Sequence, residues 1–277
     1  IATGWLLRHS APSSDAYGFK KIHPATGMYE YTNPLLGIEF SENKAAAAYA
    51  PLKSAIENLS GSLKHEGRIT TLSLYFRNLE SGDWFGIDED RTFDSASLFK
   101  VPLMIAFFKE AEKEPDILNK RFYFPENDTE AVKLNNNAQV SETIDELIYK
   151  MITKSDNNSK DILLANIDEE YLSDVYGELD IPLQKINQVY QVSAKNYSSF
   201  FRILYNATFL NRAFSEKALR YLAETDFKDG ISKSTVDESI KISHKFGFRS
   251  NTTSSIATSQ LHDCGIIYYP SRAYFLC

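Results

Sequence analysis

The sequence predicts an α+β fold in which one antiparallel sheet is built from both ends of the chain, with a helical domain inserted between them. Strand-like patterns occur early, at residues 69–76 and 84–87, and again at the end, at 240–244, 265–269 and 273–277. The residues between them are mostly helical in pattern. An order of strands, helices and then strands favours a single sheet shared by two distant parts of the chain.

The N-terminal part differs in character from the rest. Residues 1–45 contain prolines and glycines that break any long element, yet they are rich in Tyr, Leu, Ile and Phe. Solvated linkers are usually less apolar, so we interpret 1–45 as an arm or small subdomain that packs on the protein. We assign 46–95 together with 226–277 to the sheet domain, and 96–225 to the helical domain.

Individual elements follow from periodicity and turn residues. Residues 45–64 carry one apolar stripe and predict a helix that Gly67 ends. A Glu-Ser-Gly-Asp turn joins 69–76 to 84–87 and predicts a β-hairpin. Residues 98–112 are apolar almost all round, as in a helix buried on every side. Further helices are predicted at 144–153, 159–167, 172–176, 197–205 and 216–224.

Composition excludes several classes of function. The 277 residues are 43% hydrophobic and 24% charged, as in ordinary globular proteins. A net charge of −7 without a long Lys/Arg run argues against nucleic acid or an anionic membrane surface as partner. No stretch reaches the roughly 18 apolar residues of a transmembrane helix. Neither metal-ligand spacing nor a Gly-rich phosphate loop occurs, so we expect no metal and no cofactor.

A Ser-x-x-Lys motif, Ser97-Leu98-Phe99-Lys100, opens the buried helix. Asp94 and Ser95 are good capping residues, which places Ser97 in the first turn on the same face as Lys100. A serine hydroxyl is a weak nucleophile until a base takes its proton, and a lysine of lowered pKa can be that base. The free N–H groups of a helix start also favour a developing oxyanion.

Two further motifs follow along the chain. Ser155-Asp156-Asn157 lies between two predicted helices, and Lys245-Phe246-Gly247 ends the predicted strand 240–244. Taken singly, each motif has an ordinary interpretation, namely a helix-start serine, an N-cap turn and a strand-end lysine with a turn glycine. Chance matches do occur, since Ser41-Glu42-Asn43-Lys44 is also a Ser-x-x-Lys. The three motifs in this order favour a shared site.

Together the motifs resemble those of the class A β-lactamases and penicillin-binding proteins. The resemblance covers residues 45–277, where the helix, hairpin, helical insert and closing strands follow that family's order. It implies a β-lactamase/transpeptidase-like fold and a bacterial active-site-serine hydrolase that forms an acyl-enzyme. The implied substrates are β-lactams or D-amino-acid peptide amides of peptidoglycan.

The resemblance also implies a role for each motif residue. Ser97 would be the nucleophile and Lys100 its base or proton relay. Ser155 would pass a proton to the leaving nitrogen. Asn157 would bind Lys100 and the substrate amide, while Lys245 would hold a substrate carboxylate and tune Ser155.

The substrate-binding strand of the resemblance continues past the lysine. Phe246 and Gly247 would line the substrate, and the oxyanion hole would be formed by the backbone N–H groups of Ser97 and Phe248. Phe246 departs from the family, which usually has Thr or Ser there to help bind the β-lactam carboxylate. A phenyl ring cannot make that hydrogen bond, which puts recognition of β-lactams in doubt.

A second departure concerns the loop that carries the deacylating glutamate in class A β-lactamases. The corresponding stretch, 179–188, is short, and no glutamate occurs between Glu178 and Glu216. We therefore expect slow hydrolysis of an acyl-enzyme, as in a penicillin-binding protein. In the family a helix follows the last strand, whereas this sequence stops at Cys277, so that helix is either outside the given sequence or replaced by another segment, for which the arm 1–45 is a candidate.

The closing hairpin contains both cysteines. A turn centred on Pro270-Ser271 places Cys264 nearly opposite Cys277, where a disulfide is possible but strained, so two free buried thiols are the favoured interpretation. His244, beside Lys245, is interpreted as structural.

Three functions compete. The first is a serine enzyme that acylates on Ser97, the second a binding protein that kept the fold and lost the reaction, and the third an esterase or amidase in which Phe246 shapes an apolar pocket. We expect a monomer with a small-molecule or peptidoglycan-peptide substrate, in a secreted, periplasmic or cell-surface location.

Overall fold

The computed structural model describes residues 17–22, 30–33, 37–41, 48–124, 140–186, 189–234, 237, 239–251, 258–270 and 272–277. Its main sheet is antiparallel and has the strand order β10-β11-β12-β3-β4. The strands are β3 (Leu74–Asn78), β4 (Trp84–Ile87), β10 (Lys241–Asn251), β11 (Thr258–Tyr269) and β12 (Arg272–Leu276). Because β12 pairs with β3, both ends of the chain build one sheet, and the predicted fold class is confirmed.

The predicted β3–β4 hairpin is confirmed, although β3 begins five residues later than the predicted 69, at Leu74. The larger correction concerns β10, which was predicted to end at His244 and in fact continues to Asn251. Gly247 is therefore not a turn residue. A Cβ atom there would lie 3.2 Å from the Ser95 carbonyl oxygen, so glycine allows the strand to approach a neighbouring backbone closely.

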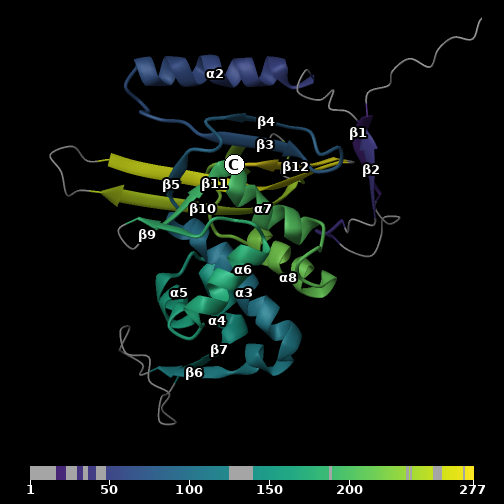
Figure 1. Cartoon of the computed structure of the whole chain (residues 1–277). Coiled ribbons are helices and arrows are strands. Elements are labelled where there is room, and N and C mark those ends of the chain that lie inside the picture. The colour runs from purple at the N-terminus through teal and green to yellow at the C-terminus, as the bar shows by residue number, and fades with distance from the viewer. Residues whose placement is uncertain are drawn as a thin grey trace, which may run out of the picture.

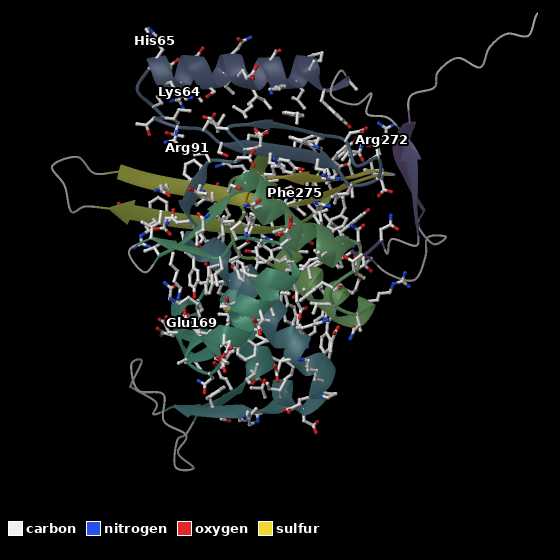
Figure 2. All side chains as sticks on the ribbon, viewed as in Figure 1. Lys64, His65, Arg91, Glu169, Arg272 and Phe275 are labelled. Carbon is white, nitrogen blue, oxygen red and sulfur yellow. A yellow bond between two sulfur atoms is a disulfide. The ribbon has the colours of Figure 1, made fainter. Side chains whose placement is uncertain are left out.

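Helices fill one side of the sheet (Figure 1). They are η1 (Ala96–Phe99), α3 (Lys100–Lys113), η2 (Pro115–Asn119), α4 (Ile144–Thr153), α5 (Asn157–Leu164), α6 (Glu169–Glu178), α7 (Ala194–Tyr205), α8 (Arg212–Ala223) and η3 (Ser232–Ser234). The predicted all-round burial of α3 is confirmed, because Val101 to Phe108 are all buried. Phe275 of β12 points between the sheet and the helices, where its ring lies 5.4 Å from that of Phe201 (Figure 2).

The helix α2 (Ala50–His65) lies on the other side of the strands from the helical domain (Figure 1). It was predicted over 45–64, of which 45–47 fall outside the described residues. Tyr49, just before it, packs its ring 4.9 Å from that of Phe76. Leu52 and Leu59 of the predicted apolar stripe are exposed.

Small sheets complete the fold and were not predicted. The strands β5 (Thr92–Asp94), β8 (Gln184–Ile186) and β9 (Val189–Ser193) pair in the order β5-β9-β8. Two hairpins are formed by β1 (Tyr17–Ile22) with β2 (Gly37–Ser41) and by β6 (Arg121–Phe124) with β7 (Val140–Thr143). The first sheet matters for the site, because it attaches the segment after α6 to the residues just before Ser97.

Part of the N-terminal arm is fastened to the helical domain. The Glu216 carboxylate of α8 accepts the backbone N–H groups of residues 30, 31 and 32 at 2.7, 2.9 and 2.9 Å. Asn33 donates its N–H to the Tyr205 carbonyl at 2.7 Å. Most of 1–45 lies outside the described residues, so its role and the three domain boundaries stay predictions.

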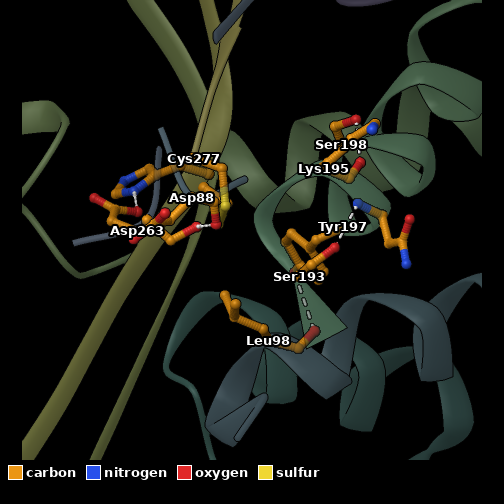
Figure 3. The surroundings of a disulfide bond; sticks show 12 residues. Asp88, Leu98, Ser193, Lys195, Tyr197, Ser198, Asp263 and Cys277 are labelled. Carbon is orange, nitrogen blue, oxygen red and sulfur yellow. Dashed lines mark hydrogen bonds and ion pairs between the residues drawn. A yellow bond between two sulfur atoms is a disulfide. The ribbon is translucent and has the colours of Figure 1, made fainter. Parts of the chain in front are cut away.

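The two cysteines form a disulfide, which corrects the expectation of free thiols. Leu276 pairs with Gly265, so Cys277 comes to lie beside Cys264, with their Cα atoms 3.9 Å apart. The strand end is itself fixed, because Cys277 exchanges two backbone hydrogen bonds with Tyr75 at 2.9 Å. Figure 3 shows the surroundings of this bond. Of the helices in the described ranges, none is both long and apolar enough to cross a bilayer.

Candidate active site

Ser97 lies in η1, a short 3₁₀ segment directly before α3, rather than in the first α-helical turn. In a 3₁₀-helix, residues three apart eclipse one another, so Ser97 and Lys100 share a face as predicted. Asp94 does cap this segment, since its Oδ1 accepts the Ala96 N–H at 2.8 Å. The predicted capping by Ser95 is wrong, because its side chain makes no capping hydrogen bond.

The backbone beside Ser97 is strained. Ala96, immediately before Ser97, has a φ of 45°, and Ser155 has a φ of 54°. Side chains other than glycine rarely adopt these left-handed values, and such strain concentrates at functional sites. Ser155 of the second motif and the residue directly before the first motif therefore share the same unusual backbone feature.

Ser155 and Asn157 flank a helix cap. Asp156 is the N-cap of α5, with its Oδ2 accepting the Ser159 N–H at 2.6 Å. The ordinary interpretation of this motif as a cap turn is thus correct for its middle residue. The residues on either side of the cap both reach Lys100.

Lys100 joins the first two motifs. Its Nζ donates to the Ser155 carbonyl at 2.5 Å, to Ser155 Oγ at 3.1 Å and to Asn157 Oδ1 at 2.8 Å. The side chain is only 1% exposed. Burial and, after it, the positive charge of Lys160 lower the pKa of Lys100 to about 8.

Lys245 joins the third motif to the second. Its Nζ donates to Ser155 Oγ at 2.9 Å and to the Phe246 carbonyl at 3.1 Å. Burial, followed by the repulsion of Lys100, lowers the pKa of Lys245 to about 7. The Ser155 hydroxyl therefore stands between two buried amines.

The strand β10 passes close to Ser97. A Cβ atom at Gly247 would lie 3.3 Å from the backbone nitrogen of Ser97. Phe248 is the next residue and pairs with Leu261 across the strands. Its side chain is exposed, and donation by its N–H to a substrate oxyanion stays a prediction.

Phe246 stacks on Phe227, a residue that the sequence analysis missed. The ring centroids are 4.0 Å apart at 20°, and Lys245 Nζ lies 4.3 Å from the Phe246 centroid. The segment of Phe227 is fastened near the site, because Asp226 donates its N–H to the Thr153 carbonyl at 2.8 Å. No motif links the two residues, which are far apart in the sequence. Only their shared aromatic character could have indicated the contact.

The segment with no glutamate lies directly against η1. The Tyr190 carbonyl of β9 accepts the Ser95 N–H at 2.9 Å, and its ring stacks on Phe99 at 4.1 Å. Glu169, at the start of α6, forms an ion pair with Lys185. An aromatic side chain thus packs against the short helix that carries Ser97.

Solved structures share this fold at low sequence identity. PBP-A matches with a TM-score of 0.61 and 20% identity, over 74% of this chain and 79% of that one. β-lactamases from Sphaerobacter thermophilus and Chitinophaga pinensis match at TM-scores of 0.62 and 0.63, each with 19% identity, over 74% of this chain and 80% and 82% of theirs. No curated protein sequence matches.

A family model described as the β-lactamase enzyme family matches residues 51–277. That range contains the Ser97, Ser155 and Lys245 motifs and the strands of the main sheet. It also covers well over half of the sequence, so the chain belongs to the β-lactamase enzyme family.

Proposed function

We propose that the protein is an active-site-serine hydrolase in which Ser97 attacks an amide carbonyl and becomes acylated. The observation that carries the proposal is the shared hydroxyl of Ser155, held by Lys100 at 3.1 Å and by Lys245 at 2.9 Å. A catalytically silent scaffold has no need of two buried amines around one serine, because burying them costs free energy.

Lys100 takes the proton of Ser97 in this mechanism. Its pKa of about 8 leaves part of the population neutral near neutral pH, which a normal lysine would not allow. The Ser97 oxygen then forms a bond to the carbonyl carbon, and the charge that develops on the carbonyl oxygen is held by the N–H groups of Ser97 and Phe248.

Ser155 returns the proton to the leaving nitrogen as the amide bond breaks. Lys245 supports this step by donating to Ser155 Oγ, and Asn157, which already binds Lys100, offers its amide to the substrate. The result is an acyl-enzyme on Ser97 and a free amine.

We propose that this acyl-enzyme hydrolyses slowly. In support, the segment after α6 places Tyr190 and not a glutamate against η1, and Glu169 is paired with Lys185. A PBP-A variant with the same fold is described as an acyl-enzyme complex with penicillin G. The proposed substrates are β-lactams and D-amino-acid peptide amides. The disulfide supports a secreted or cell-surface location, since disulfides persist in oxidising compartments.

Intact-protein mass after incubation with penicillin G, and separately with an activated acyl ester, tests the proposal. Wild type, Ser97→Ala and Ser41→Ala are compared, because Ser41 belongs to the other Ser-x-x-Lys of the chain. Peptide mapping of the adducts is expected to show a persistent adduct at Ser97 in wild type and Ser41→Ala, and none at residue 97 in Ser97→Ala. Absence of an adduct at Ser97 with both reagents would overturn the proposal, and a short-lived adduct there would overturn slow deacylation.

One observation favours a second candidate, an esterase or amidase for uncharged substrates. Phe246 and Phe227 form an apolar wall where the family has a carboxylate-binding hydroxyl. Adduct formation with the activated ester but not with penicillin G would favour this candidate.

A further inference from the structure

Three polar side chains outside the Ser97 site form a hydrogen-bonded row. His244 Nδ1 lies 2.8 Å from Asp263 Oδ1, and His244 Nε2 lies 2.8 Å from Ser232 Oγ. Successive residues of a strand face opposite sides of a sheet, so His244 lies on the reverse face of β10 from Lys245. The row is thus separate from the cluster around Ser155.

The direction of the hydrogen bonds follows from the chemistry of the groups. The carboxylate of Asp263 can only accept, so His244 Nδ1 carries the hydrogen that lies between them. Nε2 of the neutral imidazole is then an acceptor and takes the hydroxyl hydrogen of Ser232. This is the arrangement of nucleophile, base and orienting carboxylate found in serine triads.

The row is fixed by its surroundings. His244 is 1% exposed, and its ring has room because Gly265 stands opposite it, where an added Cβ atom would lie 2.4 Å from His244 Cβ. The other oxygen of Asp263 accepts the Ile231 N–H at 2.8 Å. The same carboxylate therefore orients the imidazole and holds the segment that carries Ser232.

Gly230 shows how closely this segment follows Asp263. It has a φ of 68°, and a Cβ atom there would lie 2.3 Å from Asp263 Oδ2. Ser232 itself is only half-buried, and the next residue, Lys233, is exposed. The serine is therefore held in place by a buried base and still has a face toward solvent.

We propose that Ser232 is a second nucleophilic serine, activated by His244 and oriented by Asp263, and that it reacts independently of Ser97. The substrate class is an uncharged carboxylic ester. An anionic substrate is disfavoured by the carboxylate of the row, and the ring of Phe227, 6.2 Å from the His244 ring, offers an apolar contact for the acyl group.

The reaction balances without any added group. The Ser232 hydroxyl proton passes to His244 Nε2 while Oγ forms a bond to the ester carbonyl carbon. The bond to the leaving alcohol oxygen then breaks, and the alcohol takes the proton from the imidazolium. Water repeats the two steps and releases the carboxylic acid.

A fluorophosphonate probe gives the most direct test, because it forms an Oγ–phosphorus bond with an activated serine and releases fluoride. Wild type, Ser97→Ala, Ser232→Ala and Ser234→Ala are labelled, and the modified peptide is identified by mass spectrometry. Ser234 is the matched control, since it lies in the same η3 segment. We expect label on Ser232 in the Ser97→Ala protein and its loss only when Ser232 is replaced.

The role of His244 is tested by the rate of that labelling in His244→Gln, made in the Ser97→Ala background. Removal of the base is expected to lower the rate about 10²-fold or more. Thermal unfolding shows whether each variant is folded, and release of p-nitrophenol from p-nitrophenyl butyrate gives a second measure of the reaction at Ser232. If His244→Gln does not fold, Asp263→Asn takes its place.

Two results would overturn the proposal. One is a folded Ser97→Ala protein whose Ser232 peptide stays unlabelled from pH 7 to 9. The other is labelling of Ser232 at the same rate with and without the imidazole. Neither result depends on whether Ser97 reacts with penicillin, so failure here and failure of the proposed Ser97 function are distinguishable.

Discussion

The two faces of β10 present a serine to a base in different ways. On one face, Ser155 lies between Lys100 and Lys245, two amines whose pKa values are lowered by burial. On the other face, Ser232 meets the imidazole of His244, which Asp263 orients. His244 and Lys245 are adjacent residues of one strand, yet His244 belongs to an imidazole–serine pair and Lys245 to an amine–serine cluster.

The difference lies in how each face makes a base available near neutral pH. An imidazole needs only the correct tautomer, and a single carboxylate supplies it. A lysine must first lose several pKa units, which requires desolvation and a second positive charge nearby. The face that carries Lys245, the lysine face, is therefore the one whose activity is expected to depend most on burial.

The largest expected effect comes from removing the proposed base of the first face. Lys100→Met keeps an unbranched side chain of similar length and deletes the amine. Acylation of Ser97 by penicillin G is expected to fall about 10³- to 10⁴-fold, within the range of general-base catalysis. Stopped-flow acylation rates measure the change.

The same variant sharpens the comparison of the two faces. Fluorophosphonate labelling of Ser232 in Lys100→Met is expected to match wild type, because His244 and not a lysine takes that proton. Equal loss at both serines would show that the two faces are coupled and would contradict their separation.

Two glycines, one for each face, give the next effects. At Gly265, an added Cβ atom would lie 2.5 Å from the Ser243 carbonyl oxygen and 2.4 Å from His244 Cβ, so the backbone must shift. Gly265→Ala is expected to lower the free energy of unfolding by about 3 kcal/mol, at the upper end of overpacking costs. Urea unfolding measures it.

Gly247→Ala is the matched change on the lysine face. Its Cβ atom would lie 3.2 Å from the Ser95 carbonyl oxygen and 3.3 Å from Ser97 nitrogen, contacts that a small movement of η1 can relieve. We expect a cost in unfolding free energy of about 1 kcal/mol. Acylation of Ser97 is expected to fall more than about tenfold, since displacement of a reacting group is costly. A larger stability loss at Gly247 than at Gly265 would reverse this assignment.

The pH dependence of stability separates the faces further. Lys100 and Lys245 have folded pKa values of about 8 and 7, below the ordinary lysine value of 10.5. At pH values between the folded pKa values and 10.5, the unfolded chain binds more protons than the folded one. The free energy of unfolding therefore rises as pH increases from 7 to 9. Urea unfolding of wild type and of Lys100→Met across this range tests the sign, and the variant should show a smaller rise.

The sequence predicted much of the fold and of the lysine face, and the reasons are local. Ser97 and Lys100 are three residues apart, and Ser155 and Asn157 flank one cap, so short motifs define them. The resemblance to a family then related these motifs to Lys245. Long periodic elements, such as α3 and α4, were also predicted closely, since their patterns extend over several turns.

The face that carries His244, the histidine face, could not be predicted in the same way. Ser232 and Asp263 lie 12 and 19 residues from His244 in sequence, and no motif links them. They meet because β10 pairs with β11 in a register that places Asp263 opposite Phe246, diagonal to His244. The continuation of β10 past Gly247 was not predicted either. This glycine was interpreted as a turn residue, whereas it allows two backbones to approach closely.

Phe246, which follows Lys245 along β10, gives the smallest effect and tests what the Ser97 site recognises. Phe246→Thr restores a hydroxyl that can bind a carboxylate and removes the stack on Phe227. We expect kcat/KM for acylation by penicillin G to rise about tenfold, the value of one charge-assisted hydrogen bond. Acylation by an uncharged aromatic ester should fall instead. Phe227→Leu, which removes the stack and adds no hydroxyl, is the control, and it should lower the ester rate without raising the penicillin rate. If both variants raised the penicillin rate equally, the aromatic wall would act by blocking access to Ser97 and not by the absence of a hydrogen bond.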